Sequence, residues 1–411
     1  MTPRKSYTAL AFDWLLNAPI LNELGFIPSK AESDIWMRSR SNHYEYIAHY
    51  VDDLAIVSQN PQEIIDSLKN IFSFKLKGTG PIAYHLGANF ERDQDGILCM
   101  SPSKYIDRMI ESYLRLFGTK PKTIYSSPLE RGDHPELDTS PELDIEGIKV
   151  YQSMIGAAQW IVSLGRLDIA TAVMTLSSFR AAPRKGHLDR IKRVYGYLAK
   201  MRHAKLRFRV HLPDYSTIPI PEHNWAKTIY GEVKELLPND IPPPLGEEVI
   251  LTTYVDANLC HDFTTGRSVT GILHLVNQTV VDFYSKKQPA VQTATYGSEY
   301  MAARTATEQI IELRTILRYL GVPIKSASYL FGDNKTVVDS SANPASKLSK
   351  RHVLLSYHRV REAIAAGILN FIFIPGSINP ADIMSKAWGY QAVWPMLKAL
   401  LFWEGNTMSI E

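Results

Sequence analysis

The residues of this chain with the clearest capacity for chemistry are two adjacent carboxylates, in the string Tyr50-Val51-Asp52-Asp53. Alternating apolar runs, YEYIAHYV before the acids and LAIVS after them, predict a β-hairpin with the acids at its tip. Adjacent acids repel each other unless a cation or solvent neutralises them. Magnesium held by carboxylates and substrate phosphates is one purpose that fits, and ordinary turn chemistry is the alternative.

A second set of acids stands at the ends of predicted elements in the C-terminal third. It consists of two strand-end residues and two residues near helix starts: Asp256, Asp333, Glu299 and Asp382. Taken singly, each is more simply explained as a turn residue or a first-turn helix acid. Clustered acids are costly unless cations hold them, and two magnesium ions about 3.5–4 Å apart serve the in-line attack of water on a phosphodiester. The ordered set therefore predicts a metal site of that kind.

The elements that would position this second set form a mixed sheet flanked by helices. Apolar patterning predicts the strands 249–256, 268–276, 279–285, 327–332 and 369–374. It also predicts helices at about 295–320 and 351–366. Upstream, the hairpin, further strands and helices before residue 120 indicate an α+β domain. Three helices are expected after that domain, at 151–164, 167–179 and 186–201.

Charge is concentrated in two segments, although the net charge is only +3. Residues 180–209 hold eleven Lys and Arg against Asp189, whereas residues 130–146 hold seven acids against Arg131. Because acids to pair with are nearly absent from the basic stripe, we expect it to bind a nucleic-acid backbone, and a solvated helix face is the alternative. The expected contacts are Arg184, Lys185, Arg190, Lys192, Arg193, Lys200 and Arg202.

Length and composition narrow the class of protein. A chain of 411 residues is too long for one ordinary core and indicates two or three domains. Its two cysteines, Cys99 and Cys260, exclude a disulfide framework and a four-cysteine zinc site. The N-terminus has no apolar signal region, and no stretch approaches eighteen uninterrupted apolar residues. We therefore expect an intracellular protein that does not span a membrane.

The motifs resemble those of one family. The YVDD string resembles the box of reverse transcriptases that carries two of three palm carboxylates. The text around the later acids, including DANLCHDFTTGRSVTGILHLV, GDNKTVV and IPGSINPADIMSK, resembles the ribonuclease H domain of copia-type retrotransposon Pol polyproteins. Between them, FKLKGTGPIAYHLGANFERDQDGILCMSPSKYIDRMI and YQSMIGAAQWIVSLGRLDIATAVMTLSSF resemble the palm and the helical thumb of that family. The resemblance covers nearly the whole chain and is weakest over 211–248.

The resemblance implies a multidomain fold of the α+β and α/β classes, namely a partial palm with a helical thumb, then a ribonuclease H-like mixed sheet flanked by helices. The expected parts are a partial reverse transcriptase palm (1–120), an acidic linker (121–147), a helical thumb or connection with the basic helix (148–210), a Pro-rich linker (211–248), a ribonuclease H-like domain (249–390) and a C-terminal helix and tail (391–411).

The resemblance also implies a function. It implies cleavage of the RNA strand of RNA·DNA hybrids, with two Mg²⁺ or Mn²⁺ ions held by Asp256, Glu299, Asp333 and Asp382. Asp52 and Asp53 would be metal ligands of the palm. The implied partners are nucleic acid and the N-terminal part of Pol, and the implied location is a cytoplasmic virus-like particle or the nucleus. A catalytically silent, nucleic-acid-binding transposon remnant is the alternative.

Two departures from the family pattern matter. A reverse transcriptase needs a third palm aspartate on a strand before the hairpin, and Asp13, in an apparently helical run, is a poor substitute. The fingers also have no counterpart, so we expect no primer extension from this chain alone. In the ribonuclease H half, the loop Pro375-Gly376-Ser377 lacks the histidine that many cellular members place before the last aspartate.

Overall fold

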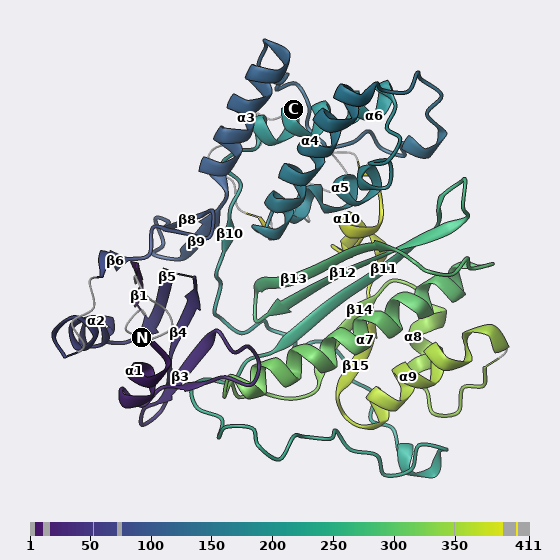
Figure 1. The fold of residues 1–411 in the computed structure, drawn as a ribbon. Coiled ribbons are helices and arrows are strands. Elements are labelled where there is room, and N and C mark those ends of the chain that lie inside the picture. The colour runs from purple at the N-terminus through teal and green to yellow at the C-terminus, as the bar shows by residue number, and fades with distance from the viewer. Residues whose placement is uncertain are drawn as a thin grey trace. The chain divides into compact units, whose positions relative to one another are not determined.

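The computed structural model describes residues 5–10, 17–51, 53–71, 76–348, 350–388 and 400–401, with the backbone alone for residues 5–10, 17 and 18. The chain divides into two compact units. Unit 1 comprises Met1–Arg92, Leu236–Val249 and Ile311–Lys325, and unit 2 comprises Asp93–Glu235, Ile250–Ile310 and Ser326–Glu411. Figure 1 labels the elements of both. Asp13, Asp52 and most of the expected C-terminal tail lie outside the described residues.

Unit 1 is built on an antiparallel sheet of six strands in the order β2-β3-β4-β5-β1-β6. Its elements are β1 (Lys5–Leu10), α1 (Asn17–Glu23), β2 (Ile27–Pro28), β3 (Ile35–Ser39), β4 (Tyr44–Tyr50), β5 (Asp53–Ser58), α2 (Pro61–Asn70), β6 (Lys77–Pro81), β7 (Tyr84–His85) and β8 (Ala88–Arg92). The apolar faces of α1, α2 and the hairpin strands meet in one core that includes Leu21, Ile47, Ile56, Ile64 and Ile65.

The predicted hairpin is confirmed, because β4 and β5 pair with Tyr50 opposite Asp53. Val51, in the turn between them, has a φ of +53°. That left-handed conformation is costly for a β-branched residue, so the surrounding strands must hold the turn in place. The sequence pattern did not predict β1, which pairs antiparallel with β5 and places Leu10 opposite Asp53.

The sheet of unit 2 has the order β13-β12-β11-β14-β15. Its strands are β11 (Leu251–Asp262), β12 (Arg267–Val276), β13 (Thr279–Lys287), β14 (Ser328–Gly332) and β15 (Leu369–Phe373). The first three are antiparallel and the last two join β11 in parallel. Figure 1 shows α7 (Thr295–Tyr319), α8 (Lys335–Ala342) and α9 (Leu354–Ala365) along one face of this sheet. The predicted mixed sheet flanked by helices is confirmed.

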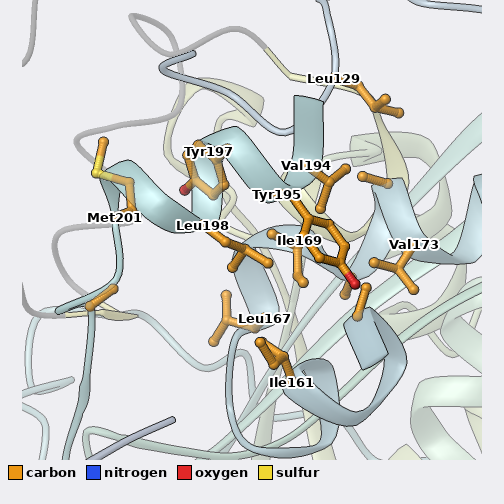
Figure 2. Packing of buried hydrophobic residues seen from close by; sticks show 14 of the residues in the cluster. Leu129, Ile161, Leu167, Ile169, Val173, Val194, Tyr195, Tyr197, Leu198 and Met201 are labelled. Atoms are coloured by element: carbon orange, nitrogen blue, oxygen red, sulfur yellow. The ribbon is translucent and has the colours of Figure 1, made fainter. Parts of the chain in front are cut away.

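A helix from earlier in the chain, α5 (Ala170–Ser177), packs against β13 of this sheet, and two neighbouring helices pack against α5. These neighbours are α4 (Ile145–Ser163) and α6 (Lys185–Lys200), with α3 (Ser103–Phe117) packed against α4 and α6. One hydrophobic cluster includes residues from these helices, such as Ile161 and Val194, and residues of the sheet side, such as Leu273 and Ile383. Figure 2 shows its helical part. Residues 148–210 and 249–390, expected as separate domains, therefore share a core.

The core of these helices also contains a buried charged pair. The guanidinium of Arg166 donates to both oxygens of Asp168, at 2.9 and 2.6 Å, and to the carbonyl of Met201 at 3.1 Å. The hydroxyl of Tyr197 donates to Asp168 at 2.7 Å. Each polar atom in this network therefore has a partner, which offsets the cost of burying the charges.

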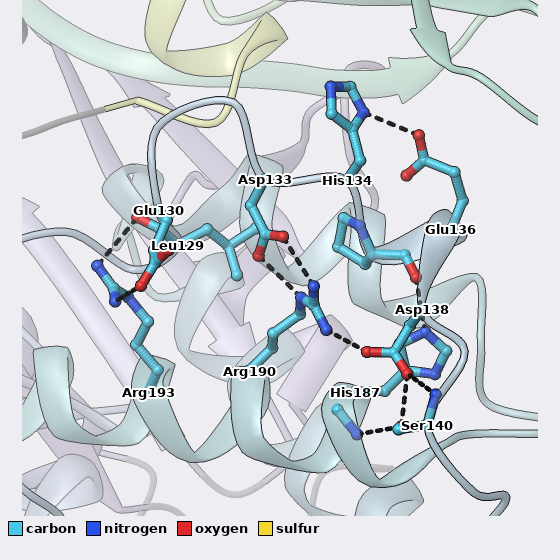
Figure 3. A network of polar contacts seen from close by, with 12 residues as sticks. Leu129, Glu130, Asp133, His134, Glu136, Asp138, Ser140, His187, Arg190 and Arg193 are labelled. Carbon is cyan, nitrogen blue, oxygen red and sulfur yellow. Dashed lines mark hydrogen bonds and ion pairs between the residues drawn. The ribbon is translucent and has the colours of Figure 1, made fainter.

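The basic stripe is largely neutralised from within the chain. On α6, Arg190 donates to Asp133 at 2.8 and 2.9 Å and to Asp138 at 2.6 Å, and Arg193 pairs with Glu130 at 3.0 Å (Figure 3). Three further cations are held by other residues: Arg184 by Glu142, Lys200 by Ser126 and Arg202 by Asp107. Lys192 lies 3.9 Å from Asp189 and over the Phe117 ring, while Lys185 is exposed.

Acids are nearly absent from residues 180–209 themselves, but the fold brings them to this stripe, because the segment 130–142 supplies them from more than forty residues away. Nucleic-acid binding by these cations stays a prediction. The expected linker 121–147 folds onto α6, with Leu129 and Pro135 buried and a 3-10 helix at Pro135–Leu137. It contributes to the packing of unit 2.

The Pro-rich segment 211–248 contains one 3-10 helix, Trp225–Lys227, and residues 229–237 are not helical. Gly231, within that stretch, has a φ of +63°, a left-handed conformation that a right-handed helix does not contain. Trp225 and Tyr230 instead pack against Arg361 of α9, whose guanidinium carbon lies 4.9 and 5.8 Å from their ring centres. In the described part of the chain, no helix combines the length and apolarity that crossing a bilayer requires.

The ion pairs of α6 lead to a first prediction. Replacing Arg190 with Gln should destabilise unit 2 by about 1–3 kcal/mol, because Asp133 and Asp138 would lose a charged, hydrogen-bonded partner. Lys185→Gln is the matched control with the same charge change, and we expect an effect within about 0.5 kcal/mol. Urea unfolding followed by circular dichroism, with hydrogen exchange over 130–138, measures both. Equal effects of the two variants on the free energy of unfolding would show that the ion pairs of Arg190 do not stabilise unit 2.

Candidate metal centre

Strand register brings two of the predicted acids together. β11 and β14 are parallel neighbours, with Val255 opposite Gly332. Asp256 directly follows Val255, and Asp333 directly follows Gly332. Because side chains at equivalent positions of parallel neighbours leave the sheet on the same face, both carboxylates lie at one level. The Asp256 side chain is buried, with a residue exposure of 2%.

The third acid, Glu299, comes from the first turns of α7. Gln288, at the end of β13, donates through Nε2 to the Ser298 carbonyl at 2.8 Å and to Thr270 Oγ1 at 3.0 Å, which fixes the start of this helix on the sheet. One carboxylate oxygen from each of Asp256, Glu299 and Asp333 lies within 4.8 Å of the other two. The structure therefore gathers three of the four predicted acids into one cluster.

The fourth acid, Asp382, lies near the cluster, close enough that burial and the charges of Asp256 and Asp333 raise its pKa, because α10 (Asp382–Ser385) lies directly on the sheet. A Cβ on Gly271 of β12 would be 2.6 Å from the Ala381 carbonyl and 2.8 Å from the Ser385 nitrogen. Only glycine permits that approach. Asp256 is the strand partner of Gly271, and its carboxylate accepts a hydrogen bond from the Ser385 hydroxyl. The close contact at Gly271 of β12 and the hydrogen bond from Ser385 of α10 therefore both hold α10 beside Asp256.

The loop before α10 is fixed by one buried amide. Asn379 donates through Nδ2 to the Val255 carbonyl at 3.0 Å, and its Oδ1 accepts from the Ala381 nitrogen at 3.1 Å. Asn379 is fully buried, so both ends of its amide are satisfied by backbone groups. It ties the loop that precedes Asp382 to the strand that carries Asp256.

Crowding changes the acidity of the cluster. Burial, then the charges of Asp256 and Asp333, hold the pKa of Glu299 well above its ordinary value. Burial and the charge of Asp256 also raise the pKa of Asp333. The same two causes raise the pKa of Asp382 to about 6. The repulsion that raises these values is what a bound cation relieves.

The donor set fits a divalent cation. Asp256, Glu299, Asp333 and Asp382 offer only oxygen atoms, the ligands that Mg²⁺ and Mn²⁺ prefer. Burial and then the charges of neighbouring acids raise the pKa values of Glu299 and Asp333, and a cation among the carboxylates would offset that penalty. The composition and the electrostatics of the cluster are therefore compatible with a divalent cation.

Sequence reasoning missed the residues that support the acids, namely Gly271, Asn379, Ser385 and Lys386. The ammonium of Lys386 lies 2.5 Å from Asp382 Oδ1 and 3.4 Å from Asp256 Oδ2. The helical spacing of Asp382 and Lys386, four residues apart, was a visible signal for this ion pair. Gly271 and Asn379 gave no such signal, because their role depends on contacts between distant segments.

The acids of the hairpin in unit 1 are less completely described. Asp53 lies at the start of β5, and its Oδ2 is 3.9 Å from Nδ1 of His85. Burial lowers the pKa of His85, and the charge of Asp53 opposes that shift. Asp52 and Asp13 fall outside the described residues. Metal binding at the hairpin therefore stays a prediction.

Comparisons with known proteins show similarity to a reverse transcriptase family and to transposon proteins. The family described as "Reverse transcriptase (RNA-dependent DNA polymerase)" matches residues 11–127. The Retrovirus-related Pol polyprotein from transposon TNT 1-94 of Nicotiana tabacum is 27% identical over 358 residues, covering 85% of this chain and 24% of the relative. A transposon Ty5-1 protein of Saccharomyces cerevisiae is 30% identical over 235 residues, covering 56% of this chain and 70% of that protein.

The chain spans about a quarter of the length of the Pol polyproteins it matches, 24% for the tobacco relative and 22% for transposon RE1 of Arabidopsis thaliana. Among solved structures, an N-terminal RNase H domain from Mycobacterium tuberculosis covers 37% of this chain and 99% of that chain. Its sequence identity is 14% and its TM-score 0.28, values too low to add to the fold described above.

The raised pKa values of Glu299, Asp333 and Asp382 predict how stability depends on pH and metal. Because the folded chain holds protons on Glu299, Asp333 and Asp382 more tightly than the unfolded chain does, the cluster favours folding most below pH ~4. Without metal, that contribution is lost as the pH rises through the folded value, about 6 for Asp382. A cation needs ionised ligands, so Mn²⁺ should stabilise the chain above pH ~6, by about 2.7 kcal/mol at roughly 100 times its Kd, and have little effect near pH ~4.

Thermal unfolding in EDTA and in MnCl₂, at several pH values, measures this effect. Asp256→Asn is the variant that should lose the manganese response, and Asp339→Asn, an exposed acid of α8, is the control that should keep it. A manganese response that is equal at both ends of the pH range, or that persists in Asp256→Asn, would contradict the assignment of these ligands.

Proposed function

The chain belongs to the copia-type retrotransposon Pol polyproteins, and from this premise we propose that unit 2 hydrolyses the RNA strand of RNA·DNA hybrids with divalent metal ions. One observation carries the proposal: oxygens of Asp256, Glu299 and Asp333 converge within 4.8 Å at one end of the sheet, with α10 bringing Asp382 alongside. A purely structural role would not account for four repelling carboxylates held together by a glycine contact and a buried amide.

The residues of the site have different roles in this proposal. Asp256 is central, because its charge raises the pKa of each of the other three acids. Asn379 and Ser385 fix the loop and helix that present Asp382. Asp256, Glu299 and Asp333 would hold divalent ions, which would supply polarisation of the scissile phosphate and a lower pKa of an attacking water. The buried sheet and α7 keep the carboxylates at fixed separations, so little reorganisation is needed on reaction.

The substrate follows from the family and from the chemistry. Phosphodiester hydrolysis with oxygen-ligated metal needs a polyanionic substrate, and hybrids are distinguished from duplex DNA by their 2′-hydroxyls and their shape. Backbone contact would come first from cations that the ion pairs leave exposed, such as Lys185 and Arg180. A binding protein without turnover is the second candidate, and the cleavage experiment separates it from the enzyme.

We expect the purified chain to cut the RNA strand of a labelled hybrid with Mg²⁺ or Mn²⁺, and EDTA to stop it. Asp256→Asn and Asp333→Asn should each lower the rate by about 100-fold or more, since changes beyond the ligands alone typically cost 10–100-fold. Asp339→Asn, the same chemical change on the exposed face of α8, should cleave like the parent. Cleavage by Asp256→Asn at the parent's rate would refute the site, and binding without any cleavage would support the silent remnant.

Polymerisation is a separate matter, and the expectation that this chain alone does not extend a primer stays a prediction. It rests on the sequence pattern, in which Asp13 is the nearest substitute for a third palm acid. Primer extension should be absent in a preparation that cleaves hybrids. The hybrid cleavage is the positive control that the chain is folded. Templated synthesis that disappears in Asp53→Asn would show that the hairpin acids have the partner they need.

A further inference from the structure

The carboxylate cluster already contains a cation of the protein itself. Lys386 follows α10 and directs its ammonium between two acids, 2.5 Å from Asp382 Oδ1 and 3.4 Å from Asp256 Oδ2. Asp256 also contributes an oxygen to the group in which oxygens of Glu299 and Asp333 converge with its own. Asp256 therefore belongs both to this three-acid group and to a lysine-bridged pair with Asp382.

The position of the lysine is imposed by the backbone. The close contact of α10 with Gly271 sets the height of the helix above β12, and the Ser385 hydroxyl bonds to Asp256 from the adjacent residue. Four residues after Asp382, Lys386 lies on the same face of the turn. Its side chain is 41% exposed, whereas that of Asp256 is 3% exposed. Lys386 can thus swing into solvent while the acid stays in place.

An ammonium and a divalent ion cannot occupy this place together. A magnesium ion bridging Asp256 and Asp382 would lie at about 2.0–2.1 Å from their oxygens. The ammonium lies within hydrogen-bond or ion-pair distance of the same two side chains, so like charge and volume both exclude the ion while Lys386 is there. The three-acid group adds oxygens of Glu299 and Asp333 to that of Asp256, and it is the position that we expect an ion to occupy first.

We propose that Lys386 occupies the second cation position of this site, so that the chain binds one divalent ion tightly at Asp256, Glu299 and Asp333 and a second only by displacing the lysine. The inference rests on the proposed function and adds a regulatory residue to it. Lys386 acts through Asp256 and Asp382, so it is a positioning residue that makes occupancy by the second ion depend on metal concentration.

The test is calorimetric titration of the full chain with MnCl₂ in the absence of nucleic acid. The wild-type chain should show two unequal sites. Lys386→Met keeps most of the side-chain volume without the charge, and it should tighten the second site by roughly tenfold, within the usual range of coupling between sites, and the first site by less. Lys386→Arg restores the charge and should bind as the wild type does.

Lys335→Met is the matched control, because Lys335 forms the same four-residue pair with Asp339, at 3.3 Å and exposed on α8. It should leave both manganese affinities unchanged. In EDTA, Lys386→Met should also unfold at a lower temperature than Lys335→Met, since the acids near Asp256 would lose their internal cation. Should Lys386→Met not fold, the wild-type titration decides by itself.

Two equal sites in the wild-type chain, or an unchanged second site in Lys386→Met, would overturn the inference. Hybrid cleavage measured on the same samples separates this outcome from a failure of the proposed function. Unequal manganese sites without cleavage would leave the lysine inference standing and remove the enzyme. Cleavage that depends on Asp256, together with equal sites, would do the reverse, and a chain that binds no ion would overturn both.

Discussion

Mutual repulsion among carboxylates is the constraint on which the rest of unit 2 depends. Asp256, Glu299 and Asp333 converge on one point, and the raised pKa values of Glu299 and Asp333 indicate that the folded chain holds the three carboxyl groups there at a cost. Strand register keeps two of the acids together in spite of this cost, because the parallel pairing of β11 with β14 leaves no freedom to separate Asp256 from Asp333. Lys386 offsets part of it, since its charge lowers the pKa of Asp382 and Glu299.

Much of this arrangement could be predicted from sequence. The acids stand directly after apolar runs of strand length, and strand-end residues of parallel neighbours meet at one edge. The long helix with Glu299 near its start was equally clear from periodicity, and its end at Tyr319 matches the glycine that follows two residues later. Local patterns were sufficient here because each acid is positioned by its own element and by the order of those elements in the sheet.

What could not be predicted depends on partners distant in the chain. Arg190 looked like a free cation, since Asp133 and Asp138 lie 57 and 52 residues away and in a segment that appeared to be a linker. Charge counting within a window compares a residue only with its neighbours, so it reported a basic surface where the fold has ion pairs. Gly271 gave no signal for the same reason, because the backbone that it accommodates is that of α10.

The helices before the sheet have a consequence for the site itself. Thr171 of α5 donates to the Ile383 carbonyl within α10 at 2.7 Å, and Tyr197 of α6 meets the Trp388 ring edge to face. α10 is therefore held by the sheet through Gly271 on one side and by α5 on the other. Asp382 and Lys386 are placed by this short helix, so the second half of the metal site depends on packing between segments more than two hundred residues apart. The residues expected as a self-contained ribonuclease H domain, 249–390, include the acids but not all the contacts that position them.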